Sequence, residues 1–263
     1  TGQTFSSFTG AVGSVFRLSN YVSANLNLAQ AFRAPNLSDM AKLGESKGDI
    51  YEVPNPDLQP EKLINIDMGL KISTESMRVD FTVYRSFITD LLASVDATYA
   101  SADTIVIGSQ IFNVKTKKNL GKAIIQGAEI AVDYSLAGSF SFRGNLTTTN
   151  GENITYNEPV GGIPPIFGLA GVRWSRGRFF LHGYSRFAAR QDRLSADDLD
   201  DPRIPPEGTP RWFTLNLRTG ITLRQSLIVQ IACENILDRN YREHGSGVNG
   251  PGRNWVISFQ MTR

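Results

Sequence analysis

Apolar and polar side chains alternate along most of this chain with a period of two residues. In one segment the apolar Ala128, Ile130 and Val132 alternate with positions that include the acidic Glu129 and Asp133. A period of two is typical of β-strands that present different faces to different surroundings. Similar patterns cover residues 8–18, 22–33, 64–72, 77–87, 128–136, 140–146, 166–174, 178–190, 213–223, 227–234 and 254–262. Only residues 38–43 suggest a helical turn. The pattern therefore predicts an all-β protein of about eleven strands.

The connections between these segments alternate in length. Tight turns are expected at 19–20, 73–76, 137–138, 175–177 and 224–225, and long polar loops at 34–60, 96–110, 150–164, 191–210 and 238–250. Antiparallel strands with all tight turns at one end and all long loops at the other form a meander with two unlike rims. The strands are also about twice as long as the five or six residues usual in globular sheets. We therefore predict a transmembrane antiparallel up-and-down β-barrel.

Aromatic residues on the apolar faces lie near the strand ends. Phe16, Tyr134, Phe140, Trp174 and Phe179 lie beside tight turns, whereas Phe32, Phe87, Phe187, Phe213 and Trp255 lie toward the long loops. Two aromatic girdles are expected where a barrel crosses the lipid–water boundaries. The alternative is a β-sandwich core, in which aromatics would occupy mid-strand positions as often as strand ends.

Net charge, cysteine content and the first residues exclude several classes of partner, bond and signal. The net charge of +2 indicates neither a nucleic-acid partner nor an acidic tail. The single cysteine, Cys233, excludes an internal disulfide and falls on the predicted lipid side. Residues 1–5 lack the basic and apolar regions of a secretion signal, so we expect a mature chain or a fragment.

Charged side chains on the polar strand faces are expected to point into the barrel, because a charge facing mid-bilayer lipid costs about 2–4 kcal/mol. The facing prediction covers Asn65, Asp67, Arg78, Asp80, Glu129, Asp133, Arg143, Arg218 and Glu234. The lumen-facing or plug-facing candidates are Arg33, Glu61, Asp67, Arg143, His182, Arg186 and Arg218, with Arg33 and Glu61 expected to form an ion pair.

No sequence arrangement supports catalysis, a metal site or a cofactor, so we expect a protein that is not an enzyme. The acidic run at residues 196–201 lacks the glycine and terminal glutamate of a calcium loop and is expected to be a solvated loop.

Five motifs in order resemble a known family. They are Phe32-Arg-Ala-Pro-Asn-Leu37, Asn55-Pro-Asp-Leu-Gln-Pro-Glu-Lys62, Gly127-Ala-Glu-Ile130, Asn235-Ile-Leu-Asp238 with Tyr241, and Pro251-Gly-Arg-Asn254. The chain resembles the C-terminal half of the barrel of a TonB-dependent outer-membrane receptor. The resemblance implies a bacterial outer-membrane barrel of about 22 strands around an N-terminal plug. On this view residues 1–263 form one part of that barrel, without the plug and the N-terminal strands.

The resemblance also implies a function. Such receptors import scarce ligands, most often ferric siderophores, haem or cobalamin, and partner with membrane lipid and with the TonB–ExbB–ExbD complex, which couples uptake to the proton-motive force. We expect a metal chelate or another small molecule to contact the extracellular loops, with Tyr51, Tyr156 and an exposed His244 as candidates, because aromatic and imidazole groups suit flat amphipathic ligands. An outer-membrane barrel enzyme and a passive porin are the alternatives. We also expect residues 1–263 to transport nothing by themselves, because an open sheet leaves unpaired edges in the bilayer.

Overall fold

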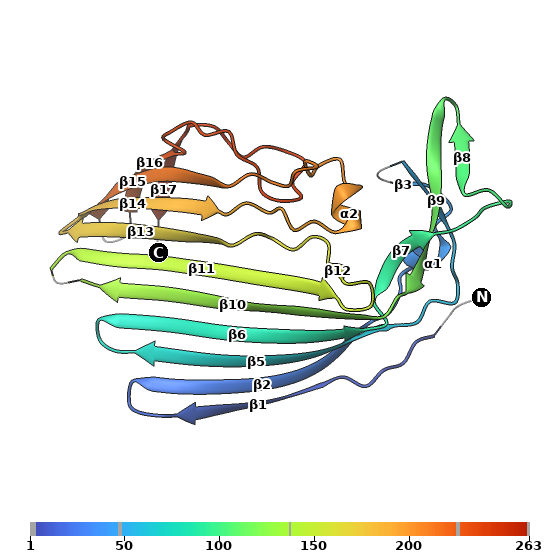
Figure 1. Ribbon diagram of the computed structural model, residues 1–263. Helices are drawn as coiled ribbons and strands as arrows, with labels where there is room; N and C mark the ends of the chain where they lie inside the picture. Colours follow the sequence, from blue (N-terminus) through green and yellow to red (C-terminus); the bar gives the residue numbers. More distant parts are fainter. Residues whose placement is uncertain (1–3, 47–48, 137, 225–226, 262–263) are drawn as a thin grey trace.

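The computed structural model describes residues 4–46, 49–136, 138–224 and 227–261. Most of the chain forms one antiparallel sheet that curves into a trough, with tight turns at one end and long loops at the other (Figure 1). The alternation of the sequence accounts for this sheet, because each strand has one apolar and one polar face. The predicted turns at 137–138 and 224–225 include residues 137 and 225, which lie outside the described residues.

Eleven strands form the continuous path of the main sheet, in sequence order. They are β1 (Gly10–Arg17), β2 (Val22–Arg33), β5 (Glu61–Ser73), β6 (Met77–Thr89), β10 (Lys122–Ser135), β11 (Phe140–Asn153), β13 (Phe167–Arg176), β14 (Phe179–Ala188), β15 (Trp212–Arg224), β16 (Leu227–Glu234) and β17 (Asn254–Met261). The short β12 (Glu158–Pro159) pairs with β11. For the main sheet the predicted number and order of strands are confirmed, but β11 reaches Asn153, so the predicted loop at 150–164 begins too early.

The register gives the sheet two chemically different faces. Ile66 and Met68 alternate with Asn65 and Asp67 in β5, and the two apolar side chains are exposed on the outward, convex face. Pairing of each strand with the next carries this alternation across the sheet. The nine polar residues of the facing prediction all share one face of the sheet, the inward face of the trough. Cys233 lies on the outward face opposite Leu217 and Trp255, as expected.

The long-loop end carries a second, five-stranded sheet that the sequence analysis did not predict. It consists of β3 (Gly44–Ser46), β4 (Ile50–Val53), β7 (Leu92–Asp96), β8 (Thr104–Ile107) and β9 (Gln110–Asn119). The expected loop at 96–110 is therefore wrong, because β8 lies inside it and pairs with β9. Phe112 and Val114 of β9 are buried, and β9 runs parallel to β4. In Figure 1 this small sheet projects beyond the end of the main sheet.

Two short helices complete the loops. The first, α1 (Leu37–Ala41), confirms the predicted turn and is capped by Asn36 and Asp39. The second, α2 (Ala196–Leu199), corrects the expectation of a solvated acidic loop, because the segment is a short helix capped by Ser195. Asp198 is buried, and its carboxylate accepts hydrogen bonds from the Ser195 and Gly162 amides. Within the described residues, neither helix has the length and apolar composition needed to cross a bilayer.

Candidate functional site: a loop vestibule and a lumen arginine cluster

The long loops enclose a cavity of about 750 Å³, which we call the vestibule. Its walls come from β7, from residues 156–162, and from α2 with residues 201–204. Lys115, Asp197 and Arg203 place both signs of charge on this wall, and Tyr156 adds an aromatic group. A second cavity of about 290 Å³ shares Leu92 and Asp197 with the vestibule. The loops thus form a recess with mixed polar and apolar walls, which is the usual character of a small-molecule site.

Ion pairs join the loops that form the vestibule. The Asp39 carboxylate accepts hydrogen bonds from Lys117 Nζ at 2.7 Å and Arg33 Nη1 at 2.9 Å. Lys115 Nζ contacts Asp200 at 3.1 Å, which ties α2 to β9. Three loops that are distant in sequence therefore meet at Lys115 and Lys117 of β9.

Two carboxylates of this region have shifted pKa values. Burial by itself raises the pKa of Asp39, but hydrogen bonds from Lys117, from the Asn36 amide and from Arg33 together lower it below its usual range. Desolvation raises the pKa of Asp197 despite the opposing charge of Lys115, and the neighbouring Asp200 adds to the rise. The loop network is thus built around an ionised Asp39. Asp197 in the vestibule wall binds a proton at a higher pH than an ordinary aspartate does.

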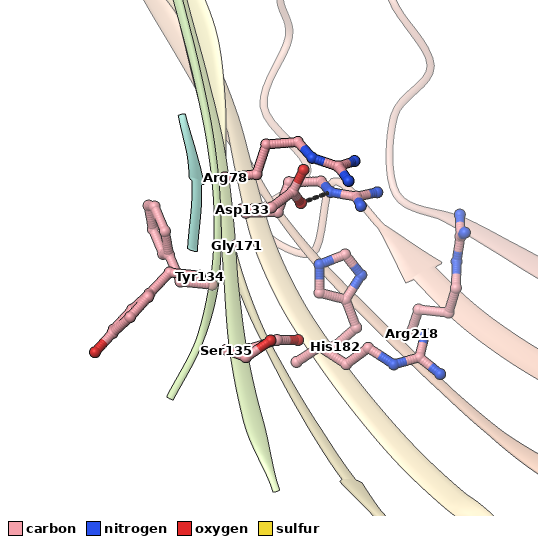
Figure 2. A pocket seen from close by; sticks show the side chains of 11 residues that line it. Arg78, Asp133, Tyr134, Ser135, Gly171, His182 and Arg218 are labelled. Atoms are coloured by element: carbon pink, nitrogen blue, oxygen red, sulfur yellow. Dashed lines mark hydrogen bonds and ion pairs between the residues drawn. The ribbon is translucent and has the colours of Figure 1, made fainter. Parts of the chain in front are cut away.

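A cluster of four arginines lies on the inward face near the tight-turn end: Arg78, Arg143, Arg173 and Arg218, hereafter the arginine cluster. The register explains their convergence. Arg78 and Arg143 both lie opposite Asp133, and Arg173 and Arg218 both lie opposite His182 in the adjacent part of the sheet. Figure 2 shows Asp133, His182 and Arg218 on one side of the sheet and Tyr134 on the other. Together these residues line a cavity of about 540 Å³.

The cluster holds more positive than negative charge. Four guanidinium groups line its cavity, and Asp133 is the only lining carboxylate among the described residues. Asp133 binds Arg143, and Arg218 lies 3.6 Å from Glu234. The Arg143 side chain is 74% exposed, so its charge is available to a partner inside the trough.

Gly171 makes room for the centre of the cluster. A Cβ at position 171 would lie 2.7 Å from Cβ of Tyr184 and 2.8 Å from Nε2 of His182. The His182 and Tyr184 rings stack at a centroid distance of 5.0 Å, and the Tyr184 hydroxyl donates to Glu234 at 3.3 Å. The absence of a side chain at Gly171 therefore permits the packing that orients His182 among the arginines.

The three predicted ligand residues lie in three different places. Tyr156 lines the vestibule. Tyr51, in β4, packs against Tyr99 with ring centroids 5.7 Å apart. His244, expected to be exposed, is partly buried: Nδ1 is 2.8 Å from the Thr209 hydroxyl, and Nε2 is buried without a hydrogen-bond partner in the described part of the chain. The structure therefore does not bring them together in one site.

The predicted lumen residues form several groups. Arg143, His182 and Arg218 meet in the arginine cluster. Arg33 and Glu61 form the predicted ion pair, and the other Glu61 oxygen accepts from the Leu92 amide at 2.7 Å. The remaining two have separate partners: Asp67 accepts from Asn27 at 3.1 Å, and Arg186 binds Glu243 at 2.8 Å.

Sequence reasoning missed Arg173, Lys115, Lys117 and Asp39. Arg173 lies on the inward face by the same parity that identified Arg143, so this signal was present in the sequence. Lys115 and Lys117 alternate with the buried Val114 and Thr116, which is a strand signal within the segment after residue 110. No local signal links either lysine to Asp39 or Asp200.

Comparison with known proteins identifies a consistent set of relatives. A family model described as TonB dependent receptor-like, beta-barrel, matches residues 1–236. A probable TonB-dependent siderophore receptor, PirA of Acinetobacter baumannii, is 20% identical over 279 residues, covering 94% of this chain and 37% of the relative. Heme/hemopexin utilization protein C of Haemophilus influenzae is 24% identical over 266 residues, covering 92% of this chain and 36% of the relative.

A solved structure shows the same fold. The copper transporter OprC superposes with a TM-score of 0.77 at 18% identity, covering 96% of this chain and 38% of that protein. This chain thus spans between 36% and 38% of the length of these three proteins.

Proposed function

Because this chain belongs to the TonB-dependent receptor β-barrel family, we propose that it forms the C-terminal part of an outer-membrane receptor that takes up a scarce iron complex. The observation that carries the proposal is the joint occurrence of the family match with a sheet that has an apolar outward face and a charged inward face. A siderophore receptor and a haem utilization protein among the relatives favour an iron chelate as the ligand.

The vestibule is the ligand-contacting region in this proposal. Its cavity of about 750 Å³ suits a small-molecule ligand, and its mixed charges and Tyr156 supply polar and aromatic contacts. Tyr51 and His244 do not line the vestibule. They are secondary candidates for contact with the ligand or with neighbouring loops.

The arginine cluster serves a different purpose in the proposal. It faces the interior near the tight-turn rim, which is the periplasmic rim of a barrel of this type. In this proposal the arginine cluster binds an acidic segment of the plug domain, because exposed guanidinium groups bind carboxylates with two parallel hydrogen bonds. The TonB–ExbB–ExbD complex acts through that plug, and additional strands pair with β1 and β17 to close the barrel.

The test uses the full-length receptor that contains this chain. We expect tight binding of one member of a panel of ferric siderophores, haem and cobalamin, and uptake that stops when TonB is deleted. Tyr156→Ala should weaken binding about tenfold, which corresponds to about 1.4 kcal/mol. Leu199→Ala is the control, because Leu199 is an exposed residue of α2 that does not itself line the vestibule, although its neighbours in α2 do.

Two outcomes would contradict the proposal. Uptake that persists without TonB and without a proton gradient would indicate a passive porin. Turnover of a lipid or peptide by the purified receptor, with no binding of any chelate, would indicate a barrel enzyme instead.

A further inference from the structure

A row of polar side chains lies on the outward face near the long-loop rim. Arg85, Gln126 and Asn150 are direct neighbours, because β10 pairs Gln126 with Arg85 on one side and with Asn150 on the other. All three side chains are exposed. Arg85 precedes Phe87, a member of the long-loop aromatic girdle, by two residues on the same face, so its Cα lies on the bilayer side of that girdle. A cation this near the girdle costs about 0–1 kcal/mol on the lipid side, a cost that an anionic partner would offset.

These residues belong to a groove of about 530 Å³ on the outward face. Ile66, Met68, Val83 and Ala128 provide apolar walls, and Arg85, Gln126, Thr148 and Asn150 provide a polar end. The Arg85 guanidinium carbon lies 5.2 Å from the centroid of the Phe87 ring, a contact that holds the cation at the groove. The groove is therefore amphipathic along its length.

Further cations lie nearer the rim on the same face. Lys62 and Lys122 both pair with Thr89, so the three positions are adjacent across β5, β6 and β10. Thr89 is four residues beyond Arg85 on β6, a separation of about 13 Å in a strand. Of the nearby carboxylates, Asp90 lies 3.9 Å from Lys62, and Glu152 is bound by Arg193. Arg85 and Lys122 have no carboxylate partner in the described part of the chain.

We propose that this groove binds a phosphorylated lipid of the outer leaflet, with a headgroup phosphate between Arg85 and Lys122 and an acyl chain along Ile66, Met68 and Ala128. The inference rests on the membrane orientation of the proposed function, which puts the long-loop rim outside the cell. A guanidinium group matches phosphate oxygens bidentately, and the amides of Gln126 and Asn150 add donors beside it. The apolar walls below the cations select a lipid over free phosphate, because an anion without acyl chains gains nothing from them.

The test measures lipid retention by the full-length receptor in neutral detergent, using native mass spectrometry and bis-phosphorylated lipid A as the probe. We expect the wild-type receptor to retain lipid A and to exchange it poorly for phosphatidylethanolamine or inorganic phosphate. Arg85→Gln with Lys122→Gln should weaken retention about 30-fold, or about 2 kcal/mol, since each cation near an anionic lipid contributes about 1 kcal/mol. Arg85→Lys should keep most of the retention.

Lys71→Gln is the matched control, because it removes one cation from the inward face of β5, where Lys71 pairs with Asp80 at 3.6 Å. Heat-modifiable gel mobility verifies that each variant is folded. Equal retention by the double variant and the wild type would overturn the inference, as would displacement of lipid A by inorganic phosphate or by phosphatidylethanolamine. Ligand uptake is measured in parallel: a receptor that retains lipid A but transports no ligand would contradict the proposed function and leave this inference intact.

Discussion

At the scale of single residues, one buried amide organises the last long loop. Asn235 is only 2% exposed, and its side chain donates to the carbonyls of Arg239 and Pro251 and accepts from the Arg239 amide. Its own amide donates to Asn216 Oδ1 at 2.9 Å. The sequence identified the motif that begins at Asn235, but its role depends on partners up to 19 residues away and was not evident from the motif.

Replacement of Asn235 by alanine should destabilise the receptor by about 2–4 kcal/mol, because it removes three part-buried hydrogen bonds that each contribute about 0.5–1.5 kcal/mol. Thermal unfolding of the full-length receptor measures the loss. Asn249→Ala is the control, since Asn249 is exposed and accepts one hydrogen bond from Arg242. Equal losses in the two variants would show that Asn235 does not hold the loop.

Asp39 predicts a pH dependence of the loop contacts. Its folded pKa lies below the ordinary value of 3.8, so its contribution is fully present above that value and is lost as the pH falls through the lower, folded pKa. Hydrogen exchange of residues 34–60 should therefore accelerate only in this acidic range. Asp39→Asn should show fast exchange at neutral pH as well, whereas Asp57→Asn in the same loop should behave like the wild type. Wild-type behaviour of Asp39→Asn would exclude this network as the tie between the loops.

At the scale of elements, the sequence predicted what depends on local alternation and missed what depends on distant pairing. The strands of the main sheet were predictable because Ile130 and Asp133 reveal their faces within a few residues. The small sheet was not, because β9 gains its partners from β4 and β7, which lie in separate loops. Similarly, parity placed Arg143, His182 and Arg218 on the inward face, but only the register brought them into one cluster.

Two glycines on neighbouring strands provide a matched test of that cluster. Gly171→Ala should destabilise the receptor by about 1–3 kcal/mol, because the new methyl group overlaps His182 and Tyr184. Gly183→Ala should be tolerated, since its Cβ would meet only Leu217 at 3.9 Å within the described structure. Urea unfolding compares the two variants. If Gly183→Ala lowers the free energy of unfolding as much as Gly171→Ala does, the loss of stability comes from replacing any glycine of the sheet and not from the packing around His182.

At the scale of the whole molecule, the main sheet has two edges. Within the described strands, β1 pairs only with β2, and β17 pairs only with β16. An unpaired backbone group in the bilayer costs several kcal/mol, so both edges require partners there. In the proposed receptor, partners at β1 and β17 therefore close the trough around its charged inner surface.

Residues 1–263 expressed alone should aggregate or form oligomers paired through β1 and β17. Refolding in detergent followed by size measurement and heat-modifiable gel mobility tests this expectation, with the full-length receptor as the control. A closed monomer of residues 1–263 that takes up ligand would contradict it.

We expect alternate residues of each strand to face lipid and the barrel interior, and a nitroxide scan of β10 measures this alternation. Single labels at residues 128–133, in a Cys233→Ala background of the full-length receptor in lipid, are exposed to oxygen, which concentrates in the bilayer. We predict high collision rates at Ala128, Ile130 and Val132 and low rates at Glu129, Ala131 and Asp133. A flat profile, or one with the opposite phase, would show that the strands do not have this orientation.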